Sequence, residues 1–215
     1  MKETRTPGKR SAEDAEVTRE AILNAALKAF SVDGFKGAGV RDIAASAGVS
    51  HGVVRHHFGS KMDLWKQAID QVFDYFGSRM IPVIEGVESS SKEGRGTALS
   101  SFRTVVAEFI DISLANPGFA RLFVLSMRDE GERADYCGER FGQLHGAIGQ
   151  LFYRAQKESP ALAAHSNDSF FYCLMSLTYF RLLFPSLGAA VEYPVSKDIT
   201  DQKSLILSVL IPEKS

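Results

Sequence analysis

Residues 40–61 read VRDIAASAGVSHGVVRHHFGSK, and this stretch predicts two short helices joined by a tight turn. The apolar residues fall at helical spacing, namely Ile43, Ala44 and Ala47 before the turn and Val53 or Val54 with Phe58 after it. Gly48 interrupts the pattern and permits the positive φ that an immediate change of direction needs. Two helices that cross at about 90 to 120° over small alanine side chains form a helix-turn-helix.

Hydroxyl side chains stand where the next two helices are expected to begin. Ser50 is placed to cap the second helix by accepting a backbone N–H. Ser60 and Asp63 have the spacing of a capping box at the start of a third helix. The turn residues therefore agree with the apolar pattern.

The outer face of the second helix indicates an anionic partner. Basic or titratable side chains gather there, namely His51, Arg55, His56, His57 and Lys61. No acidic residue occurs between Ser50 and Lys61, and Gly52 lets the backbone approach a base edge or a phosphate closely. Such a face suits a groove of double-stranded DNA.

The run from Thr18 to Leu64 resembles the DNA-binding domain of the tetracycline-repressor (TetR) family. The matching positions are Ala29-Phe30, Asp33-Gly34-Phe35, Val40-Arg41-Asp42-Ile43-Ala44, Ala47-Gly48-Val49-Ser50, Gly52, His56-His57-Phe58, Ser60-Lys61 and Leu64. Two positions depart from the family pattern. Ala38-Gly39 stands where Ser or Thr usually precedes the motif, although Gly39 is a tolerable cap, and Arg55 replaces a usual Tyr with a permanent cation.

The resemblance implies a dimeric, ligand-responsive transcriptional regulator and assigns roles on the DNA surface. The residues placed to meet base edges are Arg41, Ser50, His51, Gly52 and Val53. Those placed to meet phosphates are Arg55, His56, His57 and Lys61. These residue types are consistent with this assignment. Cationic side chains hold the DNA backbone, and the first turn of the second helix reads the groove.

Charge and cysteine content fit this interpretation. The formal net charge of −1 divides into +3 for residues 1–66 and −4 for residues 67–215, as expected for a nucleic-acid end joined to an acidic end. The two cysteines, Cys137 and Cys173, are expected to be buried and inert in a reducing cytosol rather than parts of a disulfide framework. The N-terminus lacks an apolar signal segment, which predicts a cytoplasmic protein. Residues 170–187 are too short and too interrupted to predict a membrane span.

The periodicity predicts an all-α fold with an arm and two domains. Residues 1–17 show no period and predict a disordered arm, or alternatively a basic arm that reaches a minor groove through Lys2, Arg5, Lys9 and Arg10. Residues 18–64 form a three-helix DNA-binding domain that opens with a helix over Thr18–Val32. A long helix then leads into residues 65–215, a helical ligand-binding and dimerisation domain.

Within this second domain the long helix is expected to reach about Met80 before Pro82 ends it, and residues 88–96 are expected to form a mobile linker. Further helices are predicted over Thr97–Ala115, Phe119–Met127, Ala134–Glu158, Asn167–Leu187 and Asp198–Ile211. Glycines 138, 142 and 146 recur at four-residue steps, which predicts close approach of another helix or, alternatively, room beside a cavity.

Residues 167–187 are apolar on almost every side. A helix of this kind must be buried on both sides, and we expect that one subunit cannot bury it alone. With the last helix they are expected to form a four-helix interface across a two-fold axis, of about 2,000 Å² or more. The chain is therefore predicted to act as a homodimer.

Polar and aromatic residues among the apolar stripes are candidates for an effector pocket. They are Phe102, Phe109, Phe123, Arg128, Phe141, His145, Phe152, Tyr172, Met175, Tyr179 and Arg181. The number of phenylalanines favours an apolar or aromatic small molecule.

The sequence also raises two other classes of function. Gly48-Val49-Ser50-His51-Gly52 matches the nucleophile pattern of serine hydrolases, with Asp111 and His145 or His165 downstream, but the alanine-rich residues before Ser50 favour a helix where that pattern needs a strand. A constitutive or architectural DNA-binding protein without an effector is the second alternative. No metal-ligand spacing or cofactor fingerprint is present. The sequence therefore predicts a non-enzymatic regulator, in our interpretation a repressor, that binds a palindromic operator as a homodimer and responds to a small molecule.

Overall fold

The structure, a computed structural model, describes residues 7–128, 131–184 and 199–212, and all regular elements in these residues are helices. In chain order they are α1 (Pro7–Gly37), α2 (Val40–Ser46), α3 (His51–Phe58), α4 (Lys61–Lys92), α5 (Ala98–Ala115), α6 (Pro117–Met127), α7 (Glu132–Gln156), α8 (Pro160–Ala163), α9 (Asn167–Leu183) and α11 (Ile199–Leu210). The predicted all-α fold is confirmed.

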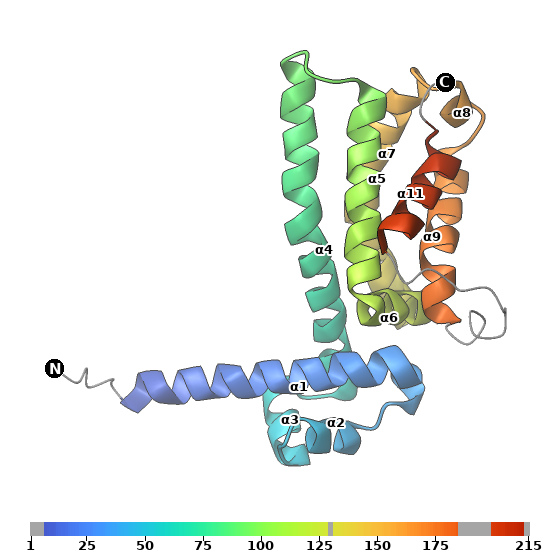
Figure 1. The fold of residues 1–215 in the computed structure, drawn as a ribbon. Helices are drawn as coiled ribbons and strands as arrows, with labels where there is room; N and C mark the ends of the chain where they lie inside the picture. Colours follow the sequence, from blue (N-terminus) through green and yellow to red (C-terminus); the bar gives the residue numbers. More distant parts are fainter. Residues whose placement is uncertain (1–6, 129–130, 185–198, 213–215) are drawn as a thin grey trace.

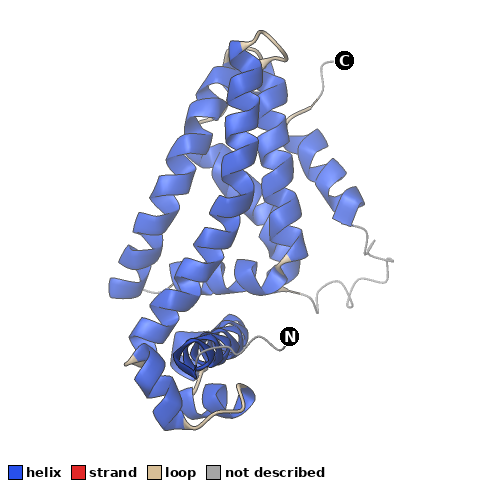
Figure 2. Cartoon of the chain, turned by 90° about the vertical axis from the view of Figure 1, so that its left-hand side faces the viewer, coloured by secondary structure: helices blue, strands red, loops and turns tan. Residues whose placement is uncertain are grey.

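Two units follow one another along α4 (Figure 1). Helices α1, α2 and α3 form a small unit at one end, from which α4 rises along a bundle that contains α5, α7, α9 and α11. Helix α6 lies across the base of the bundle and packs against α1. The view turned by 90° shows the same arrangement, with helices throughout both units (Figure 2).

The helix-turn-helix forms as the sequence predicts. Gly48 has a φ of 70°, and Ile43, Ala44, Val54 and Phe58 are buried. Ser60 caps α4 in a capping box with Asp63. The cap expected from Ser50 is wrong, because its side chain makes no capping bond and only its carbonyl accepts, from the N–H groups of residues 53 and 54.

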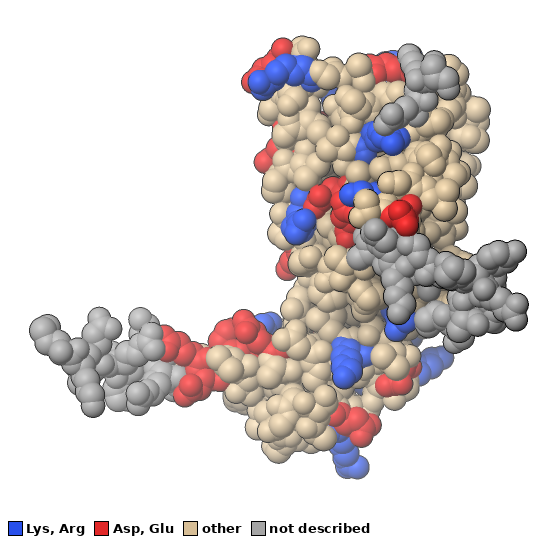
Figure 3. Space-filling view, viewed as in Figure 1, with Lys and Arg blue, Asp and Glu red and all other residues tan. Residues whose placement is uncertain are grey.

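Helix α1 begins earlier than predicted. It starts at Pro7, so residues 7–17 are helical rather than a disordered arm. Proline favours the first position of a helix, and this stretch is rich in helix-forming residues. Intrinsic helix propensity therefore accounts for the helix here, although the stretch has no apolar periodicity. Residues 12–17 are exposed, and acidic side chains gather on this protruding part of the helix (Figure 3). Lys2 and Arg5 of the basic-arm alternative lie outside the described residues, as do the side chains of Lys9 and Arg10.

Helix α4 also corrects the sequence interpretation, because it continues through Pro82 to Lys92. Proline costs a helix about 3 kcal/mol in its interior. Val83, Ile84 and Val87 nevertheless pack against the core, and this burial offsets the cost. Much of the predicted linker over residues 88–96 is consequently the last turn of α4.

Tertiary structure corrects two further expectations on α7 and α9. A side chain added at glycine 138, 142 or 146 would meet nothing within 4 Å, so the predicted close approach of a helix is wrong within one chain. Cys137 is buried as expected, but Cys173 is exposed because it lies on a face of α9 that the single chain leaves uncovered. Pro185–Leu187 of the predicted helix lie outside the described residues.

Half-buried ionic and hydrogen-bonding contacts hold the long helices together. The Arg140 guanidinium and the Tyr136 hydroxyl of α7 donate to the Asp70 carboxylate of α4, at 2.6 Å and 2.7 Å. The Glu158 carboxylate accepts from the first backbone N–H groups of α5, at 3.1 Å and 2.9 Å. None of the described helices combines the length and apolar character that crossing a membrane requires.

Candidate functional site

Helix α3 presents its first turn and its outer face to solvent. His51, Gly52, Arg55 and His56 are exposed, as are Ser50 before the helix and Arg41 on α2. Val53 and His57 are half-buried, because they lie on the flanks of the helix next to its buried residues. All nine predicted DNA-contact residues thus occupy one end of the molecule, and eight of them lie between Ser50 and the start of α4.

A hollow of about 240 Å³ lies beside α3. Its lining includes His51 and Arg55 from α3 and Lys61 from α4, together with Gly59 and Ser60 from the turn. The helix dipole of α4 adds positive potential here, because the first backbone N–H groups of that helix start at this turn. The arrangement can hold a phosphate group.

Lys61 is more constrained than the sequence indicated. Its ammonium lies 4.8 Å from the centre of the Phe35 ring, a cation–π contact within the domain. Burial lowers the pKa of Lys61, and the nearby Arg133 charge adds to this effect. A phosphate contact by Lys61 would therefore compete with its contact to Phe35.

The nucleophile pattern at Ser50 lacks the geometry of a hydrolase. The residues before Ser50 belong to α2 rather than to a strand, and Ser50 lies on the outer surface. The Asp111 carboxylate accepts from the Lys203 ammonium at 2.7 Å, and His145 is bonded to Asn167 in the helical bundle. The residues therefore do not assemble a catalytic triad.

The predicted effector residues separate into three groups. Phe109, Phe123, Phe141, Met175 and Tyr179 line one interior cavity of about 30 Å³, together with three residues of α4 that include Phe73. His145 and Phe109 line a second cavity of about 20 Å³. The other candidates lie elsewhere: Phe102 and Phe152 are core residues, Arg128 and Tyr172 are exposed, and the Arg181 side chain is outside the described structure.

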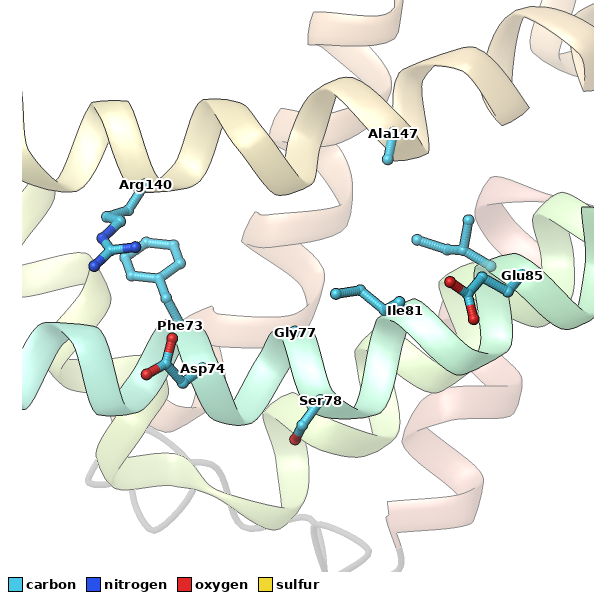
Figure 4. Close-up of a pocket in the computed structure, with 9 residues that line it drawn as sticks. Phe73, Asp74, Gly77, Ser78, Ile81, Glu85, Arg140 and Ala147 are labelled. Carbon is cyan, nitrogen blue, oxygen red and sulfur yellow. The ribbon is translucent and has the colours of Figure 1, made fainter.

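A larger groove of about 510 Å³ runs between α4 and α7, and none of the predicted residues lines it. Its lining is Phe73, Asp74, Gly77, Ser78, Ile81, Ile84, Glu85, Arg140 and Ala147. Phe73 from α4 and Arg140 from α7 line the same end of the groove (Figure 4). Phe73, Ile81 and Ile84 lie at helical spacing and mark this face of α4, but the sequence interpretation ended the helix before Pro82 and so missed it.

Comparisons with known proteins agree with this geometry. The family of bacterial regulatory proteins named tetR matches residues 22–68. The transcriptional regulator UidR of Escherichia coli is 39% identical over 156 residues, which cover 72% of this chain and 72% of UidR. The transcriptional regulatory protein RaaS of Mycobacterium tuberculosis is 28% identical over 177 residues, covering 72% of this chain and 82% of RaaS.

Solved structures show the same fold. A putative fatty acid metabolism regulator of Clostridium perfringens superposes with a TM-score of 0.69 at 16% identity, over 91% of this chain and 99% of that one. The ketosteroid transcriptional regulator KstR2 of Mycobacterium tuberculosis gives 0.67 at 16% identity, over 90% and 92%. By its sequence relatives, its helix-turn-helix and its fold, the chain belongs to the tetR family of bacterial regulatory proteins and is a DNA-binding transcriptional regulator rather than an enzyme.

Proposed function

We propose that the protein is a repressor that binds a palindromic operator as a homodimer and responds to a small apolar or aromatic effector. The observation that carries this proposal is the exposed, acid-free face of α3 beside the hollow of His51, Arg55 and Lys61. The boundary between the DNA-binding and effector domains lies in α4 near residue 64. With DNA as its partner, the protein acts in the cytoplasm.

Helix α3 is proposed to enter the major groove with its first turn foremost. Ser50, His51, Gly52 and Val53, with Arg41 from α2, then meet base edges. Arg55, His56, His57 and Lys61 meet phosphates on either side. About three phosphates neutralised per subunit give a log–log slope of affinity against salt near −5.

Dimerisation is supported by the uncovered apolar residues of α9 and α11, which lie side by side. These residues are Tyr172, Leu177, Phe180, Phe184, Leu205 and Val209. A patch of this kind on a single chain is typical of a protein interface. In the proposed dimer the two copies of α3 stand about 34 to 36 Å apart, the spacing of successive major grooves on one face of DNA.

The effector is proposed to act through the aromatic cavity of Phe109, Phe123, Phe141, Met175 and Tyr179. Helix α4 contributes to that cavity and also begins at the DNA-binding surface, so a rearrangement around a ligand can shift both. A coupling free energy of about 1 to 3 kcal/mol would change operator affinity by roughly 5- to 150-fold.

The constitutive alternative rests on a specific observation. The two interior cavities, of about 30 and 20 Å³, have room for little more than one water molecule each. A protein whose second domain only dimerises would need no more space. A ligand screen by thermal unfolding separates the two functions, because a compound that binds the folded state raises its melting temperature.

The test of the proposed function begins with mapping of the DNA sites that the protein occupies in cells. A palindromic site would then be used in fluorescence anisotropy, with salt and candidate effectors varied. A site without two-fold symmetry, or an affinity that does not depend on salt, would contradict the proposal.

A further inference from the structure

His145 holds a hydrogen-bonding atom that the described structure leaves without a partner. Its Nε2 atom lies 3.0 Å from the Asn167 amide nitrogen. Because an amide nitrogen only donates, Nε2 is the acceptor, and the proton of the neutral ring is on Nδ1. That Nδ1 atom is buried and has no hydrogen-bond partner. A buried donor in this state is unfavourable, because it has lost its hydrogen bond to water and has gained none within the protein.

The surroundings of His145 are aromatic. Its ring centre lies 5.1 Å from that of Phe141 and 4.7 Å from that of Phe171. The small cavity that His145 and Asn167 line is also bounded by Phe109, which lines the neighbouring cavity as well. His145 therefore lines a void that shares one wall residue, Phe109, with the neighbouring void.

The walls of these voids can adapt. Met175 lines the larger void, and its unbranched side chain readily takes other conformations. Phe73 lines both this void and the open groove between α4 and α7, so the aromatic interior lies one side chain away from solvent. Because Phe73 lines the groove and the larger void, and Phe109 lines both voids, these are the two side chains that a ligand entering from the groove has to displace to reach His145.

We infer that the effector is a neutral aromatic compound with a carbonyl oxygen, which accepts a hydrogen bond from the His145 Nδ1–H while its ring occupies the space next to Phe109 and Phe141. This inference rests on the proposed function, because it names the class of ligand for the same cavity. Specificity arises because an analogue without the oxygen leaves the buried donor unpaired.

The protonation state of His145 favours a carbonyl over a carboxylate. Burial lowers the pKa of His145, and the charge of Asp168 opposes this only in part. The ring is therefore neutral at pH 7 and offers one donor without a positive charge. A buried carboxylate would need a cation at this position.

Two probes of matched shape test the inference: acetophenone, and α-methylstyrene, in which a CH₂ group replaces the carbonyl oxygen. Binding to the full-length protein is measured by thermal unfolding and by the NMR signal of the His145 ring nitrogens. His145→Phe removes the donor with an aromatic ring retained. His145→Gln keeps an N–H donor, and His165→Phe serves as the control because His165 is exposed.

We expect wild type, His145→Gln and His165→Phe to bind acetophenone about 10-fold or more tightly than α-methylstyrene. The preference should vanish in His145→Phe, and acetophenone should shift the Nδ1 signal of the wild type. Equal affinity of the wild type for both probes, no binding of either, or an unmoved Nδ1 signal would overturn the inference. Because the NMR signal is recorded on the wild type, it tests the inference even if a variant fails to fold.

Operator binding is measured in parallel to keep the two proposals distinct. If acetophenone binds through His145 and leaves operator affinity unchanged, the class of ligand assigned to the cavity stands, and the proposed control of operator binding by a ligand fails. If another class of compound releases the operator while acetophenone does not bind, ligand control stands and this inference fails.

Discussion

The Arg133 guanidinium lies 4.3 Å from the centre of the Phe35 ring, which joins the first turn of α7 to the end of α1. Phe35 also contacts Trp65 and the Lys61 ammonium. Beside it, the Lys66 ammonium donates to the Glu132 carboxylate at 2.7 Å. The effector domain thus contacts the DNA-binding unit through α7 as well as through α4 and α6, and a movement of α7 has a direct route to the base of the DNA-binding surface.

Arg133→Gln should weaken this junction. Loss of the cation–π contact is expected to lower the free energy of unfolding by about 0.5 to 1 kcal/mol. Trp65 is the single tryptophan of the chain and lies at the junction, so its fluorescence during urea unfolding reports the change. Arg128→Gln, at an exposed position, is the control, and equal unfolding energies for the two variants would contradict the prediction.

Ser60→Ala and Ser50→Ala should separate capping from DNA contact. The Ser60 hydroxyl accepts from the Asp63 N–H at 3.1 Å, and its loss should cost about 1 kcal/mol of stability. Ser50 makes no capping bond, so its substitution should change stability by less than about 0.5 kcal/mol and act instead on operator affinity. Thermal unfolding and anisotropy measure the two effects. A large loss of stability in Ser50→Ala would contradict the assignment.

Arg55→Ala should reduce operator affinity uniformly across sequences. Removal of one phosphate contact from each subunit of a dimer should also make the salt slope shallower by about 2. His51→Ala should instead reduce discrimination between operator variants, because a base-edge contact carries sequence information. Arg95→Ala, in the exposed turn after α4 and far from α3, is the charge-matched control. An unchanged slope in Arg55→Ala would remove its phosphate role.

Phe180→Asp or Leu205→Asp should convert the dimer to monomers. The two side chains are 53% and 64% exposed on α9 and α11 in the single chain, and a charge in a dimer core would be left unpaired. Light scattering after size-exclusion chromatography measures the mass. Val17→Asp, also at an exposed apolar residue but on α1, should stay dimeric. Monomeric wild type, or dimeric Phe180→Asp and Leu205→Asp, would refute the proposed interface.

Tyr179→Phe should alter the stability of the protein at alkaline pH. Burial raises the pKa of the Tyr179 hydroxyl, which lies 3.1 Å from the Ser113 hydroxyl, so the folded state keeps its proton where the unfolded chain releases it. Stability from this group is complete below about pH 10 and falls above it by up to about 1.4 kcal/mol per pH unit.

Tyr179→Phe has no hydroxyl that titrates at this position. The difference between the free energies of unfolding of the wild type and the variant should therefore shrink above about pH 10. Urea unfolding at several pH values measures the difference. Tyr172→Phe, at a residue 70% exposed on α9, should follow wild type. A constant deficit for Tyr179→Phe across the pH range would contradict the expectation.

The helix-turn-helix could be predicted because its causes are local. The positive φ of Gly48, the capping box of Ser60 and the burial of Ile43 and Phe58 all follow from residue type and spacing within a few turns. The five candidate effector residues that line the aromatic cavity could be named for the same reason, since apolar periodicity identifies the side chains that face a helical core.

The sequence by itself determined the all-α class, the register of α2 and α3, and the cationic residues that α3 presents, because short-range sterics and helical periodicity suffice for these features. Tertiary structure decided the rest. The passage of α4 through Pro82 depends on burial against other helices, and the groove between α4 and α7 depends on how two distant segments meet. The unpartnered Nδ1 of His145 likewise depends on Asn167, 22 positions away, and spacing along one helix carries no information about such a neighbour.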